Sequence, residues 1–215
     1  RHRLEGRNTL NRPGLLDNAG RLRKADGVLV RVPADAIAWN HIEAANESLH
    51  RFPVAPPRDG RVALVWHALA TLTPERGRAC CLLPRSAVEG SKGMPLRRHL
   101  VDHNLLDTVI EVPTCLHSGI QVPQIMLLIK QNRVITTTAF ISMHCQPDLT
   151  TSYDVSGIER ALQAWRQRQQ APWLRMVTQA EMAAQRYPLM AEAFAGAPPS
   201  ARQAAAGQSA RTQNQ

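Results

Sequence analysis

Short continuous apolar runs and segments with helical spacing alternate along the chain. Runs rich in aliphatic and β-branched residues predict buried strands at residues 26–32, 79–83, 108–112 and 124–130. A further run, TTTAFISM at residues 136–143, predicts an outer strand. Because strands that alternate with helices are typical of layered folds, the pattern indicates one α/β sheet.

Two helices are predicted between these strands. Apolar residues recur at steps of three and four over residues 61–72, which predicts a helix with one buried face. A second helix begins at Pro95, since proline is favoured in the first helical turn. Its inward residues are expected to be Leu96, Leu100, Val101 and Leu105, and its outward residues Arg97, Arg98 and His99.

The segments outside these runs carry weaker patterns. Residues 35–60 end in a loop signature rich in proline and are expected to be irregular and exposed. Residues 156–170 predict an amphipathic helix. Thr178 stands three residues before Glu181, the spacing of a capping box, which predicts the start of a short helix.

The length and the end of the chain indicate one domain with a tail. The 215 residues are enough for one domain of ordinary size, expected over residues 1–194. Residues 195–215 consist mainly of small and polar residues without periodicity and are expected to be disordered. The chain starts without methionine in what resembles mid-domain sequence, so we expect a fragment of a longer protein. No apolar run approaches the roughly 18 residues that a membrane span requires, so we expect no membrane partner.

The carboxyl ends of two predicted strands indicate where a ligand would bind. Pro84 ends one strand and precedes a loop with the sequence SAVEGSKG. Pro113 ends the next strand and precedes the loop TCLHSGIQVP. In open α/β sheets ligands bind beyond the carboxyl ends of the strands, so these loops predict the working rim.

The charge balance favours a polyanionic partner. Lysine and arginine number 26 against 17 acidic residues, which gives a net charge of +9. An alternative explanation is that the arginine content follows a GC-rich genome. Charge alone therefore leaves nucleic-acid binding open.

Several kinds of site are not supported by the residue pattern. The cysteines show no CxxC spacing, and Cys80 and Cys81 are expected to act as small core residues in a reducing cytoplasm. His99 and His103 share a helix face but are expected to be a solvated or internally satisfied pair, so no metal site is predicted. The sequence contains no GxGxxG, P-loop or Gly-x-Ser-x-Gly motif.

The order of several segments resembles the modification subunits of type I restriction-modification systems, which are N6-adenine DNA methylases. The resemblance covers residues 6–194 and is carried by GRNTLNRPG, KADGVLVRVPAD, RFPVAPPRDGRVALVWHALATLTPERGRACCLLPRSAVEGSKG, LRRHLVDHNLLDTVIEVPTCLHSGIQVPQIMLLIKQN and VTQAEMAAQRYPL. It implies a Rossmann-like methyltransferase fold, of which the chain holds the C-terminal half of the sheet. It also implies S-adenosylmethionine as cofactor and an adenine flipped out of DNA as substrate.

The catalytic motif of that family is altered in this chain. The family's Asn-Pro-Pro-Phe motif, which holds the target amine and stacks on the base, falls on Arg31, Val32, Pro33 and Ala34. An arginine can only donate hydrogen bonds, and its charge opposes positive charge that develops on the amine. Ala34 removes the stacking ring. The resemblance therefore implies a catalytically impaired methylase.

Other family positions also differ. The polar residues of the family's next helix correspond to Arg61, Ala63, Ala68 and Leu69, and its rim aromatic corresponds to His117. The family's glycine-rich cofactor turn lies upstream of the residues present, so we expect binding of S-adenosylmethionine to be doubtful and assign it no residues.

DNA and the specificity and restriction subunits are the partners that the resemblance implies. The expected DNA contacts lie on the rim or on the basic helix. They are Arg85, Ser86, Lys92, Arg97, Arg98 and His117. A non-catalytic DNA-binding or subunit-binding module is an alternative, and a gene product without function is another. The strand at residues 26–32 would lie at an exposed apolar edge, which predicts self-association or a partner.

Overall fold

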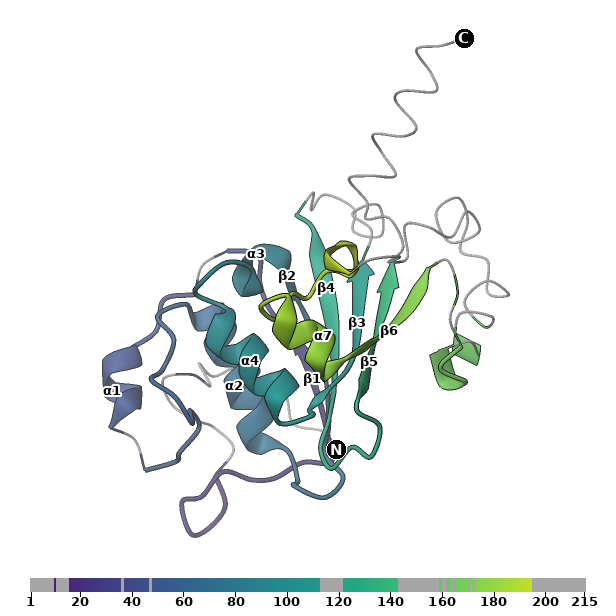
Figure 1. Ribbon diagram of the computed structural model, residues 1–215. Coiled ribbons are helices and arrows are strands. Elements are labelled where there is room, and N and C mark those ends of the chain that lie inside the picture. The colour runs from purple at the N-terminus through teal and green to yellow at the C-terminus, as the bar shows by residue number, and fades with distance from the viewer. Residues whose placement is uncertain are drawn as a thin grey trace.

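A six-stranded mixed sheet forms the centre of the protein (Figure 1). The computed structural model describes residues 10, 16–35, 37–46, 48–112, 122–142, 159, 162–163, 165–169, 171 and 173–194. The strands are β1 (Gly27–Arg31), β2 (Arg78–Pro84), β3 (Leu106–Val112), β4 (Gln124–Lys130), β5 (Thr137–Ser142) and β6 (Leu174–Thr178). Their order is β1-β2-β4-β3-β5-β6. By their pairings, β1, β2, β3 and β5 run in one direction, and β4 and β6 run in the other.

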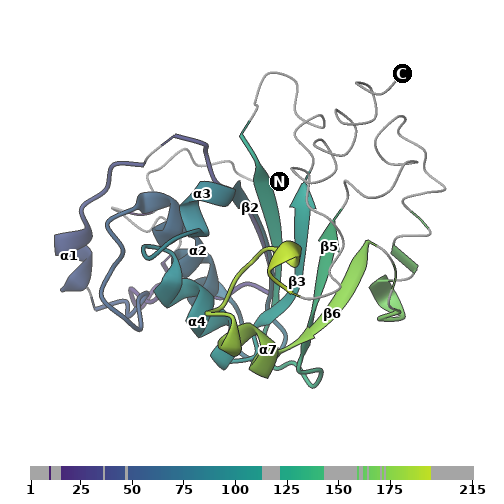
Figure 2. The same cartoon turned by 45° about the horizontal axis from the view of Figure 1, so that its top comes forward.

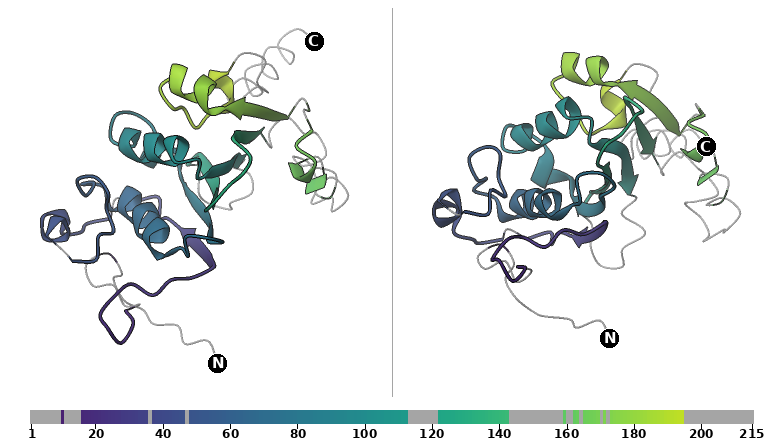
Figure 3. Two further views of the ribbon diagram at one scale, coloured as in Figure 1. Left: turned by 60° about the horizontal axis from the view of Figure 1, so that its bottom comes forward. Right: turned by 90° about the horizontal axis from the view of Figure 1, so that it is seen from below.

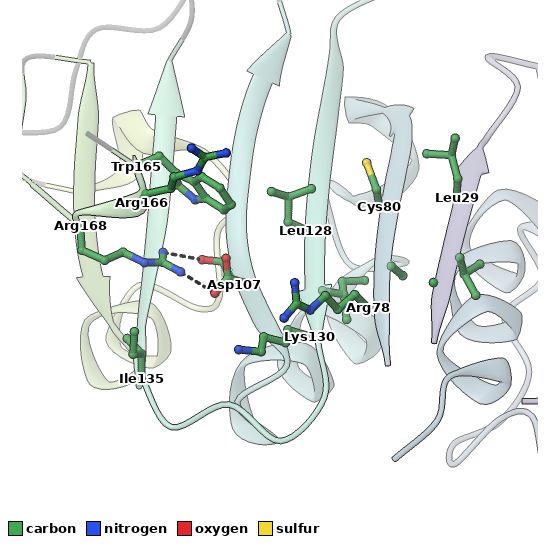
Figure 4. Close-up of a pocket in the computed structure, with 14 residues that line it drawn as sticks. Leu29, Arg78, Cys80, Asp107, Leu128, Lys130, Ile135, Trp165, Arg166 and Arg168 are labelled. Atoms are coloured by element: carbon green, nitrogen blue, oxygen red, sulfur yellow. Dashed lines mark hydrogen bonds and ion pairs between the residues drawn. The ribbon is translucent and has the colours of Figure 1, made fainter. Parts of the chain in front are cut away.

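The helices of residues 41–102 and 179–193 gather on one face of this sheet (Figure 3). They are α1 (His41–Ala45), α2 (Gly60–Thr71), α3 (Arg85–Val88), α4 (Met94–Asp102), α7 (Gln179–Ala184) and the 3-10 helix η3 (Ala191–Ala193). The helices α2, α4 and α7 lie side by side over the strands, whereas α1 lies farther out (Figures 1 and 3). On the opposite face, Trp165 and Arg168 bond to Thr108 and Asp107 of β3 (Figure 4).

A single apolar core fills the space between the helices and the sheet. Trp66 of α2 is 2% exposed, and Leu83, Leu127 and Phe140 of the strands are fully buried. Burial of aliphatic and aromatic side chains is the main favourable contribution to folding, at about 25 cal/mol per Å² of apolar surface. This core therefore fixes the position of the strand ends that make up the rim.

Local patterns predicted most of the elements. The predicted strand at residues 124–130 coincides with β4, and β1, β2, β3 and α2 lie within two residues of their predictions. Thr178 caps α7 in a complete capping box with Glu181, as the spacing predicts. Within the helix predicted at 156–170, the described residues 159, 162–163 and 165–166 are helical, whereas the predicted tail at 195–215 lies outside the described residues.

Three expectations need correction. The strand predicted as an outer one, β5, is one strand in from the edge, because β6 pairs antiparallel with it. Residues 35–60 are not simply irregular and exposed, since they contain α1 and the buried Arg51, and the Trp39 and Phe52 rings pack at 5.4 Å between centroids. The predicted loop after Pro84 begins with α3.

The helices of the described ranges are all too short or too polar to cross a lipid bilayer.

Candidate functional site

The carboxyl ends of the parallel strands form a common rim at the upper edge of the sheet in Figure 1 (Figure 2). At the end of β1 the N–H of Val32 donates to Leu82 O at 2.8 Å. At the end of β2 the N–H of Arg85 donates to Pro123 O at 2.8 Å, which joins this end to the start of β4. The end of β2 at Pro84 therefore lies at the predicted rim of the sheet. Pro113 and the loop after it lie outside the described residues.

The segment Arg31-Val32-Pro33-Ala34 leaves β1 at this rim. Val28 and Val30 pack against the core on the helix-covered side, so by strand alternation Arg31 lies on the opposite face, where it is exposed. Val32 is 3% exposed, and its N–H extends the pairing with β2 by one residue. A proline at position 32 could not donate this hydrogen bond. The altered segment is thus built into the sheet.

Arg61 holds the last residue of this segment. Its Nη1 donates to Ala34 O at 3.0 Å, and its Nη2 lies 2.7 Å from Asp59 Oδ2. Asp59 also caps α2 by accepting the N–H of Arg61 at 2.9 Å. Burial disfavours the charged Asp59 carboxylate, but hydrogen bonds from Arg61 outweigh it and lower its pKa. A charged pair therefore fixes the path of the chain after β1.

Arg85 stands at the start of α3 with its charge already paired. Its guanidinium forms ion pairs with Glu89 and, at 2.9 Å, with Glu192. Burial alone would lower the pKa of Arg85, but these carboxylates raise it overall. The side chain links the β2 end to the C-terminal part of the described chain, so in this structure it is not a free phosphate ligand.

Arg97 is buried, which corrects its expected outward position. It is 7% exposed, and its guanidinium donates to Tyr187 O at 2.8 Å, to Gly90 O at 2.9 Å and to Val88 O. Burial lowers its pKa. The side chain therefore ties α4 to the segment after α3 and to residues beyond α7.

His99 also departs from the expected outward position. Its ring packs on Trp66 at 4.7 Å and on His103 at 4.0 Å between centroids. Burial, with a further contribution from His103, lowers the pKa of His99 to about 4, so it is uncharged at neutral pH. Among the described residues, no group of histidine, cysteine and acidic side chains could hold a metal ion.

The remaining predicted contacts are exposed or undescribed. Ser86 and Lys92 are exposed, and the Arg98 side chain is 68% exposed with an ion pair to Asp102 at 3.1 Å. His117 lies outside the described residues. Lys92 and Arg98 are therefore the cationic candidates that remain accessible.

Two buried polar residues near the rim were not predicted. Glu111 of β3 is 5% exposed and accepts the N–H of Ala191 at 3.0 Å, and burial raises its pKa. Gln124 at the start of β4 is 8% exposed, and its Oε1 has no hydrogen-bond partner within the described part of the chain. In the sequence, the feature that could have identified these two residues is a polar side chain at the end of an otherwise apolar strand.

The two cysteines of β2 differ in environment. Cys81 is fully buried, and burial raises the pKa of its thiol to about 12, so it serves as a core residue as expected. Cys80 points to the other sheet face and is only half-buried. Neither thiol has the lowered pKa of a reactive nucleophile.

The sequence pattern of the N-6 DNA methylase family matches residues 2–202, nearly the whole chain. The chain belongs to this family. The sheet that carries Arg31 to Ala34 at its rim is thus part of an N-6 DNA methylase domain.

Curated relatives point to the type I systems. The chain is 32% identical over 111 residues to the methylase subunit of the type I restriction enzyme MpnII of Mycoplasma pneumoniae. It is 34% identical over 110 residues to the corresponding StySPI subunit of Salmonella potsdam. These matches cover 49% and 47% of this chain but 20% of each relative. The chain is therefore similar to type I methylase subunits. The match spans only a small part of the relatives' length.

Solved structures share the fold. The type I methyltransferase subunit of Streptococcus thermophilus matches 87% of this chain with a TM-score of 0.73 at 20% identity, over 41% of its own length. A putative class I S-adenosylmethionine-dependent methyltransferase of Listeria monocytogenes matches 67% of this chain with a TM-score of 0.51 at 14% identity. The predicted α/β methyltransferase-like fold class is confirmed.

Proposed function

We propose that this chain carries the target-base side of a type I adenine DNA methylase and that its own methyl transfer is impaired. The supporting observation is the exposed arginine, Arg31, at the carboxyl end of β1, where the family places the group that accepts hydrogen bonds from the target amine. A guanidinium has only donors, and a fixed positive charge opposes the charge that develops on the nitrogen during methylation. The proposal extends to residues 1–194 as one partial methylase domain.

The described rim residues do not fit S-adenosylmethionine. The cofactor's sulfonium is a cation, and the side chain at the β1 end, Arg31, is also a cation. The described turn that leads from β2 into α3 is formed by Pro84 and Arg85 and contains no glycine for close approach of a ligand to the backbone. We therefore assign no described residue to this cofactor.

Calorimetric titration of the purified chain with S-adenosylmethionine is expected to give no binding heat. Tritiated-methyl transfer to hemimethylated duplex DNA is expected to stay at the background of a reaction without protein. A complete type I methylase subunit, assayed in parallel, is the positive control. Robust turnover by the chain alone would contradict the proposal.

A second candidate function is a DNA-binding or subunit-binding module without catalysis. The observation that favours it is a pair of exposed cationic side chains, Lys92 and Arg98, on the α3–α4 side of the protein, together with the net charge of +9. Exposed cations bind phosphates and release counterions, which makes affinity depend on salt. The proposed partners are DNA and the other subunits of a type I system, and the proposed location is the cytoplasm. The exposed edge of β1 is proposed to support self-association.

Replacing Lys92 or Arg98 by alanine is expected to weaken duplex-DNA binding uniformly across sequences. Each change should reduce the slope of log K against log salt by about 1, because one phosphate contact is lost. Fluorescence anisotropy at several salt concentrations measures this slope. The control is Arg21→Ala, an exposed arginine in the turn of residues 17–21. An affinity that stays constant between low and physiological salt would refute DNA binding.

A further inference from the structure

The chain between α3 and α4 forms a tight turn on the helix-covered side of the sheet, after the rim end of β2 (Figure 1). We call residues 88–93 the rim turn. Gly90 has a φ of +70°, a conformation that glycine adopts without strain. A Cβ atom at Gly93 would lie 2.1 Å from Val88 O, so glycine is needed for the two ends of the turn to approach this closely. The two glycines therefore determine the shape of the turn.

The buried side chain of Arg97 holds the rim turn in place. Its Nη1 donates to Val88 O and, at 2.9 Å, to Gly90 O. Its Nε donates to Tyr187 O at 2.8 Å, so the guanidinium is fixed at a third point. Leu96, the preceding residue of α4, is fully buried, which fixes the helix that carries the arginine. The turn is therefore attached to the core through one side chain.

Lys92 is exposed in the rim turn, between two residues whose carbonyls accept hydrogen bonds. The N–H of Met94 donates to Ser91 O at 3.2 Å, and the N–H of Arg97 donates to Gly93 O at 3.0 Å. The first turn of α4 thus holds the backbone on both sides of the lysine, and Arg97 holds the other half of the turn. The position from which the ammonium group extends is therefore fixed before any ligand binds.

Lys92 also lies near the altered motif. Burial raises the pKa of Asp59, whereas hydrogen bonds from Arg61 and, more weakly, the charge of Lys92 lower it. Because the interaction between charges weakens with distance, the ammonium group is close to the N-cap of α2. Arg61, two residues after that N-cap, donates to Ala34 O at 3.0 Å. The rim turn and the segment after β1 therefore meet at the same part of the rim.

A lysine on a fixed backbone binds a phosphate more tightly than one on a mobile loop, because less conformational entropy is lost on binding. We propose that Arg97 is a positioning residue, which holds the rim turn so that Lys92 is presented to a DNA phosphate beside the altered motif. The guanidinium contacts the protein alone and acts through the lysine. This inference rests on the second candidate function, in which Lys92 contacts DNA.

Two variants disturb the rim turn while they leave Lys92 in the chain. Gly93→Ala places a Cβ atom against Val88 O, so the turn must shift. Arg97→Lys keeps the positive charge, but an ammonium group cannot reproduce the planar fork of donors that reaches three carbonyls. Each variant is expected to bind duplex DNA about eightfold more weakly at ~0.1 M salt, the contribution of one phosphate contact. Fluorescence anisotropy measures the affinity.

Gly77→Ala is the matched control for Gly93→Ala. A Cβ atom at Gly77 would lie 2.5 Å from another backbone oxygen, Thr73 O, and this glycine precedes β2 at the end of the strand away from the rim. Thermal unfolding followed by circular dichroism is expected to show a lower melting temperature for both variants. DNA affinity is expected to fall with Gly93→Ala and to stay at the parent value with Gly77→Ala. Equal losses of affinity would reveal a general effect of stability and overturn the proposal.

Combination with Lys92→Ala separates positioning from direct contact. Because Arg97 acts through Lys92, Arg97→Lys is expected to change neither the affinity nor the salt slope when Lys92 is already alanine. A further loss in that background would overturn the proposal. If Lys92→Ala alone bound DNA like the parent chain, the contact at Lys92 would fail and the inference with it. If Lys92→Ala weakened binding but Gly93→Ala and Arg97→Lys did not, the positioning role alone would be overturned.

Discussion

A type I methylase whose target-base motif is replaced by the residues of this chain, Arg31 to Ala34, is expected to lose at least about 10³-fold in kcat. Removing one preorganised hydrogen-bonding group from an active site costs about 10²–10³ in rate. Loss of the stacking ring removes about 1–3 kcal/mol. The introduced guanidinium adds repulsion of the developing charge. Single-turnover transfer of a tritiated methyl group to duplex DNA measures the effect.

A control variant keeps both the amide and an aromatic ring. Replacing only the phenylalanine of the motif by tryptophan keeps an aromatic face and is expected to stay within about tenfold of the parent rate. Calorimetry with the cofactor measures its affinity separately, which is expected to fall in the four-residue variant because the introduced arginine is a cation near the cationic sulfonium. If the four-residue variant kept its rate within tenfold, the altered motif would not explain impaired catalysis.

Arg97→Ala is expected to lower the free energy of unfolding by about 3 kcal/mol. The guanidinium donates to three backbone carbonyls, of Val88, Gly90 and Tyr187, and alanine would leave these acceptors without their partner. Each buried acceptor left unsatisfied costs about 1–3 kcal/mol, reduced where water enters the cavity. Urea denaturation followed by far-ultraviolet circular dichroism measures the change.

The neighbouring arginine supplies the matched control. Arg98→Ala removes the same side chain from the next position of α4, where it is 68% exposed and forms an ion pair with Asp102. An exposed pair of this kind contributes little to stability, so no measurable change is expected. Arg97→Ala variants that unfold like the parent protein but bind DNA more weakly would instead support a phosphate contact for Arg97.

Arg97 and Arg98 show why helical periodicity predicted exposure wrongly for one of two neighbouring residues. Helical spacing places Arg97 beside Arg98 and away from the leucine stripe, which predicts exposure for both. The observed burial depends on Tyr187, 90 residues later in the chain, returning over α4. A contact between segments so distant in sequence leaves no periodic signal in either segment.

The strand β6 and the exposure of Leu29 were not predicted from the sequence for the same reason. Residues 174–178 contain an arginine and a methionine on a short run, and their strand state depends on the unpaired edge that β5 offers. The exposure of Leu29 depends on which elements fail to cover β1, whereas the apolar run itself predicts burial. Coverage of a sheet face is a property of the whole arrangement.

The sequence by itself determined the α/β fold class, the strand end at Pro84 and the capping box of α7, and the altered motif from Arg31 to Ala34 stays a prediction. These features depend on local periodicity, local hydrogen bonding or residue identity. Only the tertiary structure decided that Arg85 and Arg97 are engaged internally and that Arg61 holds Ala34. Those outcomes follow from distant segments meeting in space, where burial and pairing of charges are set by neighbours that are remote in the chain.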